Sequence, residues 1–188
     1  RFVTIDTETT GFHAYAGDEI VSVALLELQG LELTGRRYAT LIDPDRPIPA
    51  ASSEIHRVRD EDVRGCPSIR EALPDILDFI GDAVLIGHHV GFDLRFLNKN
   101  LQKYLLCRLC NPWIDTMLLF TTYTGRMAHY GLDEVAEFCR VPVHGRHTAV
   151  GDAQATAKIF AVLAARLIRQ AQPVQALIGQ QFQSGHEI

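Results

Sequence analysis

The sequence predicts an α/β protein in which helices cover both faces of a mixed central β-sheet. Three observations support this prediction. Strand-like segments with nearly continuous apolar residues occupy the first quarter of the chain. Segments with apolar residues three or four positions apart, as in amphipathic helices, fill most of the rest. One further apolar segment of strand length, AVLIGHH, separates these helices.

Three strands are expected in the first part of the chain. FVTIDT is short and apolar, and EIVSVALLEL is nearly continuous in apolar residues, as in a strand covered on both faces. RRYATLID alternates and ends at Pro44, and GLELTG is expected to supply the turn before it. Short turns between successive strands indicate an antiparallel meander.

Helices are expected after the proline-rich loop PDRPIPAAS. SSEIHRVRDEDVRG favours one or two short helical turns, and SIREALPDILDFIG a longer helix that Pro74 should kink or split. WIDTMLLFTTY is expected to lead from a strand into a helix. Helical periodicity also marks three further segments, FDLRFLNKNLQKYLL, GLDEVAEFC and GDAQATAKIFAVLAARLIRQ.

Length and composition are typical of one globular domain, with 188 residues of which 47% are hydrophobic. We expect residues 1–172 to form this domain and residues 173–188 to be a C-terminal tail, peripheral helix or linker. The absence of an apolar run of about 18 residues predicts a soluble, cytoplasmic chain without a membrane partner. The net charge of −5 argues against tight non-specific binding of nucleic acid, although an enzyme can grip a few phosphates through metal ions.

Two acids lie close together in the first strand. Asp6 and Glu8 are two positions apart, so both side chains project from the same face of the strand, and Thr7 projects from the other. A divalent cation such as Mg²⁺ or Mn²⁺ would relieve their mutual repulsion. Solvated acids at an exposed strand end are the alternative, and the spacing alone leaves both open.

Three more polar residues favour a functional site. Asp93 follows an apolar strand at the start of a helix, where ligands gather in open α/β sheets. His147 is expected in a loop, and Asp152 in the first turn of the longest helix. Each acid could instead cap or stabilise its helix, and His147 could be an ordinary loop histidine. The four acids and one histidine together indicate a catalytic centre.

The motifs IDTETTG, HHVGFD and HTAVGDAQAT, in this order, resemble those of the DEDDh, or DnaQ-like, 3′–5′ exonucleases. This family includes the proofreading epsilon subunit of bacterial DNA polymerase III. The resemblance extends from Phe2 to about Ala171 and implies an RNase H-like fold, with an exonuclease domain over residues 1–172. The five-residue step from His147 to Asp152 favours the histidine class over a sister group that uses tyrosine.

The resemblance implies a metal-dependent hydrolysis that releases nucleoside 5′-monophosphates from a 3′ end. Two divalent cations, Mg²⁺ or Mn²⁺, would be held by four carboxylates. Asp6 would bridge both ions, Glu8 and Asp152 would complete the site of the nucleophilic water, and Asp93 would serve the second ion. His147 would accept the proton of that water.

The resemblance also implies a site for the terminal nucleotide. The backbone of Thr9, Thr10 and Gly11 would approach the sugar and its 3′-hydroxyl, and Phe12 would wedge against the bases. His56 and Phe92 would line the pocket. Simple packing is an alternative for Phe12, His56 and Phe92.

Expected partners are single-stranded or frayed 3′ ends, of DNA rather than RNA, together with a DNA polymerase or flanking domains in replication or repair. An exoribonuclease or oligoribonucleotide-degrading enzyme, and a non-catalytic polymerase-associated module, are alternatives. His89 departs from the family, which commonly has asparagine there. The pair His88–His89 could suggest zinc, but adjacent histidines on an extended segment would face opposite ways.

Overall fold

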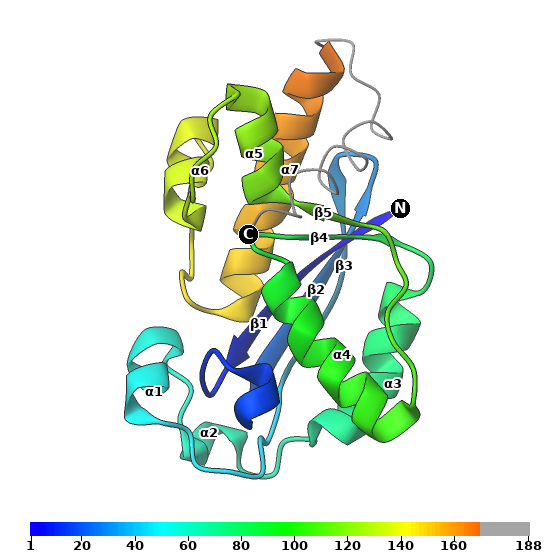
Figure 1. Cartoon of the computed structure of the whole chain (residues 1–188), viewed down its shortest axis with the longest axis vertical. Helices are drawn as coiled ribbons and strands as arrows, with labels where there is room; N and C mark the ends of the chain where they lie inside the picture. The colour runs from blue at the N-terminus through cyan, green and yellow to red at the C-terminus, as the bar shows by residue number, and fades with distance from the viewer. Residues whose placement is uncertain (170–188) are drawn as a thin grey trace.

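The computed structural model describes residues 1–169, and the predicted tail 173–188 with its boundary at residue 172 lies outside them. Thirteen strands and helices follow one another along these residues (Figure 1). In chain order they are β1 (Phe2–Thr9), η1 (Ala14–Ala16), β2 (Ile20–Gln29), β3 (Glu32–Leu41), α1 (Ala50–His56), α2 (Asp60–Val63), α3 (Ile69–Ile80), β4 (Val84–Gly87), α4 (Gly91–Leu105), β5 (Trp113–Asp115), α5 (Thr116–Thr124), α6 (Leu132–Cys139) and α7 (Ala149–Arg169).

The five strands form one mixed sheet in the order β3-β2-β1-β4-β5, which confirms the predicted fold class. β1 pairs antiparallel with β2 and parallel with β4. Its pairing with β4 ends at Thr4, whereas its pairing with β2 continues to Thr9. Residues 5–9 of β1 therefore extend beyond its pairing with β4. A polar site can open at this end of the central strand, where the parallel and antiparallel halves of the sheet meet.

Helices cover both faces of the sheet. On one face, Val3 and Ile5 of β1 pack into a core with residues of α3 and α4. On the other face, Ala24 and Leu26 of β2 pack against the start of α7. Asp6 lies opposite Ala24 in the antiparallel pair, so its side chain shares the face covered by α7.

The turn expected at GLELTG is wrong, and so is the alternative that Pro74 splits its helix. β3 begins at Glu32, because Gln29 pairs with Glu32 and the hairpin closes over two residues, with Gly30 in the left-handed conformation that such a turn favours. The helix α3 is not split at Pro74 but is continuous. Its buried side packs on the sheet, while Pro74 faces solvent, where water can satisfy the carbonyl that loses its partner.

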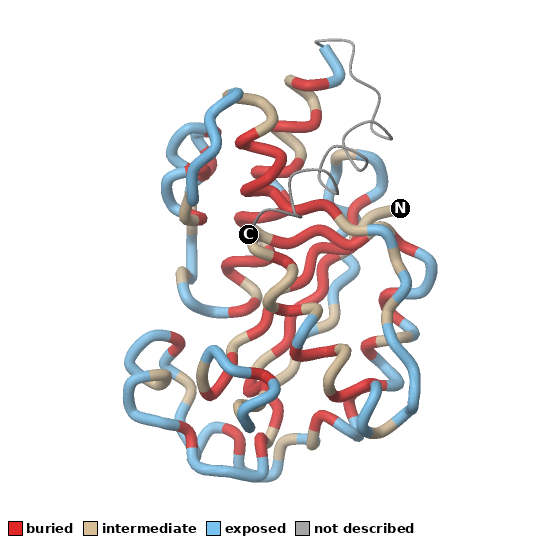
Figure 2. The backbone as a smooth tube through the Cα atoms, in the orientation of Figure 1, coloured by how far each residue is buried: buried red, intermediate tan, exposed pale blue. Residues whose placement is uncertain are grey.

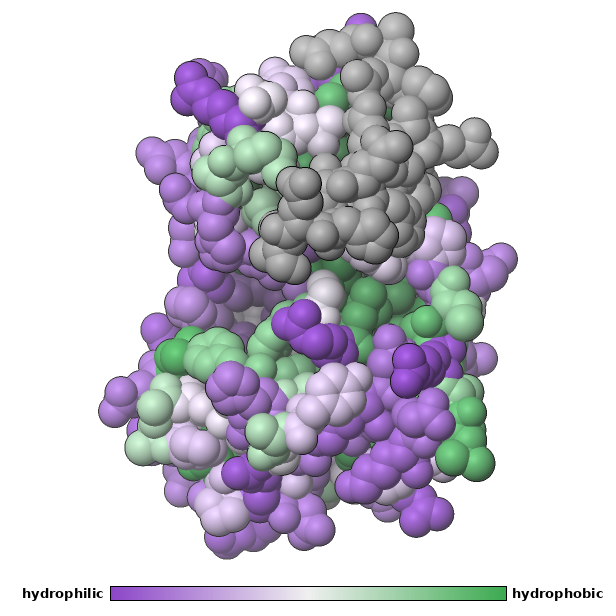
Figure 3. Space-filling model, viewed as in Figure 1, coloured by the Kyte–Doolittle hydropathy of each residue, from purple (hydrophilic) through white to green (hydrophobic). Residues whose placement is uncertain are grey.

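Buried residues follow the strands, the core-facing sides of α3 and α4, and most of α7, whereas the outer turns of α1 and α2 are exposed (Figure 2). Hydrophilic residues predominate on the face of the molecule seen in Figure 3, with smaller apolar groups between them. Within residues 1–169, no helix combines the length and the apolar character that a membrane crossing requires.

Candidate active site

Three of the predicted acids meet at the end of β1. Asp6, Glu8 and Asp152 each place one ligand atom within 4.8 Å of the others. The first two project from β1, and Asp152 comes from the first turn of α7. Small residues at the start of α7, Ala149 and Ala153, pack on β2 and let the helix approach closely enough for this contact. The same-face prediction for Asp6 and Glu8 is confirmed.

Asp93 reaches the end of β1 from the opposite face. It is buried in the first turn of α4, and its Oδ1 accepts a 2.7 Å hydrogen bond from Thr7 Oγ1. Thr7 thus faces away from Asp6 and Glu8, as predicted. Asp93 does not belong to the three-carboxylate group. Burial is the largest cause of the raised pKa of Asp6, and the charge of Asp93 is the next largest.

The start of α4 is placed by Asp115, a residue that the sequence analysis did not identify. Its carboxylate accepts the backbone N–H groups of His89 at 3.2 Å and of Val90 at 2.9 Å. These bonds turn the chain after Gly87, and His89 adopts a positive φ of 59°. Asp115 therefore fixes the turn from which Asp93 projects.

The expectation that His88 and His89 lie on an extended strand and face apart is wrong. β4 ends at Gly87, and the two imidazole rings lie 4.8 Å apart in the turn that follows. His88 contacts Thr116 Oγ1 and the carbonyl of Tyr130 through its two ring nitrogens. Among residues 1–169, no histidine joins a cluster with metal-ligand spacing.

Burial and mutual repulsion make the ionised acids unfavourable without a cation. Burial, followed by the charges of Asp93, Glu8 and Asp152, raises the pKa of Asp6 well above its usual range. Burial and the charge of Asp152 raise the pKa of Glu8 to about 7, and burial raises that of Asp93 to about 7.

The donor set suits a hard divalent cation. Asp152 is buried, and its Oδ1 has no hydrogen-bond partner among the described residues, although burying an unpaired carboxylate oxygen is costly. Carboxylate oxygens are the ligands that Mg²⁺ and Mn²⁺ prefer. The residues present therefore fit such an ion.

His147 lies in the loop that precedes α7, with a positive φ of 60° and an exposed side chain. This loop packs directly on the helix at Gly151. A Cβ atom there would lie 2.1 Å from the carbonyl oxygen of Gly145 and 2.5 Å from that of His144. The Asp152 N–H also donates to Thr148 O at 2.9 Å. These contacts fix the loop that carries His147 relative to the first turn of α7, which carries Asp152.

Arg146, which the sequence analysis missed, brings a positive charge into this site. Its NH1 donates to Asp152 Oδ2, and its Nε lies 3.0 Å from both carboxylate oxygens of Asp133 in α6. Burial lowers the pKa of Arg146, but the bonds and charges of Asp133 and Asp152 outweigh it and raise the pKa overall. Its position next to the predicted base His147 was the available sequence signal.

A cavity of about 380 Å³ opens beside the acids. A pocket of this size is sufficient for a small ligand. Of the predicted site residues, Asp93 and Thr10 do not line it. The lining residues are Asp6, Thr7, Glu8, Thr9, Gly11, Phe12, Ala51, Ser52, Ile55, His56, Phe92, Arg146, His147 and Asp152.

Apolar and histidine side chains lie on the other side of this cavity. Phe12 is 74% exposed, and its ring meets that of Phe92 edge-on with centroids 6.3 Å apart. Ile55 of α1, which the sequence analysis missed, is 45% exposed. His56 is buried, its Nδ1 accepts the Val58 N–H, and its Nε2 has no partner among the described residues. The wall thus combines exposed apolar surface with a buried, unpaired nitrogen.

The loop after β1 is shaped by internal hydrogen bonds. Thr9 Oγ1 donates to Gly11 O at 2.6 Å, and Thr10 Oγ1 accepts the Glu19 N–H at 3.0 Å. A Cβ on Gly11 would lie 2.4 Å from the Asp18 carboxylate. The two threonine hydroxyls thus position the backbone of the loop.

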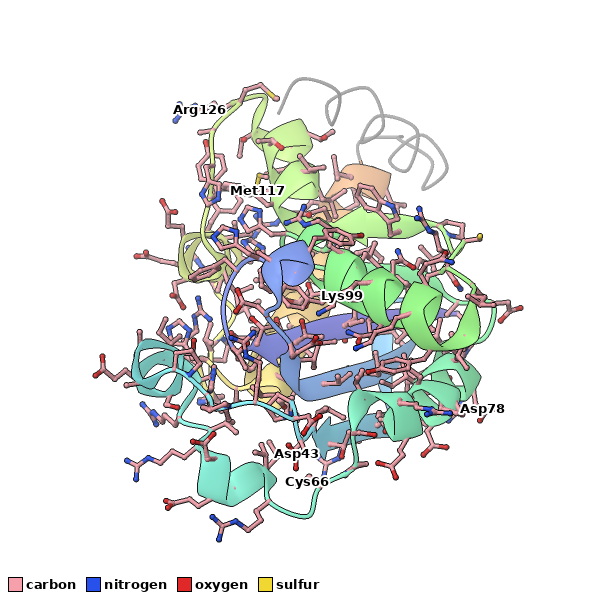
Figure 4. All side chains as sticks on the ribbon, turned by 60° about the horizontal axis from the view of Figure 1, so that its bottom comes forward. Asp43, Cys66, Asp78, Lys99, Met117 and Arg126 are labelled. Carbon is pink, nitrogen blue, oxygen red and sulfur yellow. The ribbon has the colours of Figure 1, made fainter. Side chains whose placement is uncertain are left out.

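Lys99, labelled in Figure 4, ties this loop to α4. Its ammonium group lies 2.9 Å from Asp18 O and 2.5 Å from Glu19 Oε1. The loop that borders the cavity is therefore anchored to the same helix that carries Asp93.

A mixed sheet of this topology, with a carboxylate cluster at the end of its central strand, is the RNase H-like fold that exonucleases of known structure share. The model of the family RNase_T, described as Exonuclease, matches residues 3–160. The chain belongs to this exonuclease family.

Relatives include subunits and parts of bacterial DNA polymerase III. The chain is 39% identical over 164 residues to a DNA polymerase III subunit epsilon-like protein of Rhodobacter capsulatus, covering 85% of this chain and 23% of that protein. It is 35% identical over 159 residues to a PolC-type DNA polymerase III of Thermotoga maritima, covering 85% of this chain and 11% of that protein. It is 33% identical to the DNA polymerase III epsilon subunit of Aquifex aeolicus, with 85% and 78% covered. The chain thus spans a small part of the first two relatives and most of the third.

Solved structures of exonucleases share the fold. Exonuclease X in complex with 5′-overhanging duplex DNA matches with a TM-score of 0.70 and 23% identity, over 88% of this chain and 92% of that one. Exonuclease I of E. coli in complex with a dT13 oligonucleotide matches with a TM-score of 0.73 and 15% identity. The match covers 90% of this chain and 42% of that one.

Proposed function

We propose that this chain is a DEDDh-type exonuclease that removes nucleoside 5′-monophosphates from the 3′ end of DNA. The observation that carries the proposal is the group of three carboxylates, Asp6, Glu8 and Asp152, which borders a cavity together with His147 and exposed apolar side chains. Similarity to DNA polymerase III epsilon subunits and to exonucleases solved with DNA supports DNA as the substrate.

We assign Asp6, Glu8 and Asp152 as ligands of divalent cations, either Mg²⁺ or Mn²⁺. Asp93 would complete the set from the opposite face, after its contact with Thr7 adjusts. Two bound cations would stabilise negative charge on the reacting phosphodiester and activate the attacking water. The carboxylates would hold these ions at the end of the rigid central strand.

His147 would accept the proton of the attacking water on its imidazole ring, whose ordinary pKa is close to neutral pH. The water oxygen adds to phosphorus, and the bond from phosphorus to O3′ of the preceding nucleotide breaks. The terminal nucleotide leaves as a 5′-monophosphate, and O3′ of the shortened strand takes up a proton from solvent to become a 3′-hydroxyl group. The exposed loop position of His147 suits this role, because the side chain can move onto a bound substrate.

The terminal nucleotide would occupy the cavity beside the acids. Phe12 and Ile55 offer exposed apolar surface against which a base can stack or pack, without sequence preference. The unpaired Nε2 of His56 and the backbone of Thr9 and Gly11 would contact the sugar and its 3′-hydroxyl group. Phe92 would hold the ring of Phe12 in place through their edge-on contact.

The test is the cleavage of a single-stranded DNA oligonucleotide that carries a 5′ fluorescent label, in the presence of Mn²⁺ or Mg²⁺. We expect a ladder that shortens from the 3′ end, with nucleoside 5′-monophosphates as products. EDTA and Asp6→Asn should each abolish the reaction. Asp82→Asn is the matched control, because the Asp82 side chain is fully exposed and makes one ion pair, with Arg1.

Three other outcomes would contradict parts of the proposal. Immediate loss of the 5′-labelled nucleotide would reverse the assigned polarity. Faster turnover of a matched RNA oligonucleotide would make the chain an exoribonuclease. Binding of the oligonucleotide without any cleavage, at saturating Mn²⁺, would make it a non-catalytic module. Association with a DNA polymerase stays a prediction that copurification of the full-length protein can address.

A further inference from the structure

Arg146 occupies a position between two carboxylates that differ in their surroundings. Its NH1 donates to Asp152, which is buried within the acidic group, and its Nε contacts both oxygens of Asp133 at 3.0 Å. The Asp133 side chain is 65% exposed, whereas that of Asp152 is 7% exposed. The guanidinium therefore joins the interior of the site to its surface.

The contact with Asp152 places a guanidinium on an acid that the proposed cation would also bind. Asp152 is one of the three acids with metal-ligand spacing, and its Oδ2 is bonded to Arg146 while its Oδ1 has no partner. A cation bound by all three acids would lie close to the guanidinium. Two positive charges at this separation repel, more strongly in a partly buried site than in water.

The two contacts of Arg146 use different nitrogens. Since Nε contacts Asp133 and NH1 contacts Asp152, the guanidinium can release Asp152 and keep Asp133. Asp133 lies in the first turn of α6, on a different element from Asp152. Its paired oxygens offer the bidentate geometry that an arginine favours.

We propose that Arg146 competes with the divalent cation for Asp152 and withdraws onto Asp133 when the cation binds. Arg146 is then a positioning residue that sets the cation affinity of the site, a role that rests on the metal site proposed above. In the absence of the cation, its charge partly replaces the cation and stabilises the ionised acids.

Withdrawal of Arg146 would also change the surroundings of His147. Arg146 Nη1 lies 3.3 Å from His147 Nδ1, so the guanidinium contacts that ring nitrogen as well as Asp152. When Nη1 leaves Asp152, the His147 ring loses this contact too. Cation binding and the surroundings of the proposed base would then be linked through one side chain.

The experiment is calorimetric titration of the full chain with Mn²⁺, at fixed pH and low ionic strength, comparing wild type with Arg146→Gln. We expect the variant to bind Mn²⁺ about tenfold more tightly, the factor that corresponds to about 1.4 kcal/mol. Arg108→Gln is the matched control, since Arg108 is exposed and makes no ion pair with any described residue. Its Mn²⁺ affinity should equal that of wild type.

A second measurement compares melting temperatures in EDTA and in Mn²⁺. Arg146→Gln should melt at a lower temperature than wild type in EDTA. Adding Mn²⁺ should raise the melting temperature of the variant by more than that of wild type. Arg146→Lys keeps the charge but lacks the planar fork that contacts both carboxylates. We expect its Mn²⁺ affinity to lie between those of wild type and Arg146→Gln, which keeps the test decisive if the glutamine variant does not fold.

The outcomes separate the two proposals. Equal or weaker Mn²⁺ binding by Arg146→Gln and Arg146→Lys, in proteins whose nuclease activity requires Mn²⁺, would overturn the competition and leave the metal site standing. If neither wild type nor either variant binds Mn²⁺, the metal site itself is wrong. Tighter binding by Arg108→Gln of the same size would reduce the effect to net charge and also overturn the proposal.

Discussion

Thr7 Oγ1 donates a 2.7 Å hydrogen bond to Asp93 Oδ1 and so joins the central strand to the first turn of α4. Both residues are buried. The bond lowers the pKa of Asp93, but burial is the larger effect and raises that pKa to about 7. Thr7 therefore favours the ionised form of the one proposed cation ligand that lies on the α4 face.

The first prediction concerns this hydrogen bond. Thr7→Val keeps the side-chain shape but removes the donor, so a buried carboxylate loses a partner. We expect the free energy of unfolding to fall by about 1.5–3 kcal/mol at pH 8, where Asp93 is ionised, and by less at pH 5.5. Urea denaturation at the two pH values measures this. Thr7→Ser, which retains the hydroxyl, is the control, and equal losses in both variants at pH 8 would contradict the assignment.

The second prediction concerns the proposed base. His147→Ala should lower kcat by about 10²–10⁴, because the attacking water then lacks a proton acceptor within the protein. Mn²⁺ affinity should stay within a few-fold of wild type. His144→Ala is the matched control, because His144 is an exposed histidine in the same loop. Near wild-type turnover in His147→Ala would show that another group accepts the proton.

The third prediction concerns the contact between the loop and α7. Gly151→Ala should displace residues 144–147, because the new Cβ atom would overlap the carbonyl oxygens of His144 and Gly145. We expect a lower melting temperature and a lower kcat, although alanine at an open helical position stabilises by up to about 1 kcal/mol. Gly91→Ala in α4 supplies that comparison, since its Cβ would meet nothing closer than Arg95 at 3.9 Å. Similar stabilisation in both variants would contradict the close packing.

The fourth prediction concerns pH in the absence of metal. The pKa values of Glu8 and Asp93 are raised to about 7 in the folded chain, from 4.5 and 3.8. Between about pH 4 and 7 these two acids bind more protons in the folded state than in the unfolded state, so their contribution to stability falls as pH rises. The lowered pKa of His88, about 4, acts in the opposite direction below about pH 6.5. The raised pKa of Glu8 alone corresponds to a change of about 3 kcal/mol in the free energy of unfolding.

Urea denaturation in EDTA from pH 4.5 to 8 measures this slope. Saturating Mn²⁺ should flatten or reverse it, because the cation favours the ionised acids. Glu8→Gln should reduce the slope in EDTA, whereas Asp82→Asn, at a fully exposed position, should not. An equal slope in wild type and Glu8→Gln would contradict the raised pKa of Glu8.

Local periodicity explains which parts of the site could be predicted. The two-residue period of a strand places Asp6 and Glu8 on one face whatever the rest of the fold does. The order of elements was likewise readable from apolar spacing. Their places after a strand, in a loop and in a first helical turn singled out Asp93, His147 and Asp152, and the family resemblance then implied their roles.

Tertiary contacts explain what could not be predicted. Arg146 and Asp115 act through partners on other elements, and no local pattern identifies those partners. Ile55 looked like an ordinary helical residue, because its exposure beside the cavity depends on where α1 lies. Pro74 was expected to break its helix, but it faces solvent, and the packed side of α3 holds the helix together.

β1 continues beyond its pairing with the parallel strand β4. As a result, the two sides of the site differ in how easily their backbone can move. Asp6 and Glu8 stand on a strand at the centre of the sheet, fully paired with β2, so their backbone can open only when the sheet itself comes apart. Arg146 and His147 stand on the loop between α6 and α7, outside the sheet. Adjustment to cation and substrate therefore falls to the loop, and changes in its sequence can retune the enzyme while the acids on β1 keep their positions.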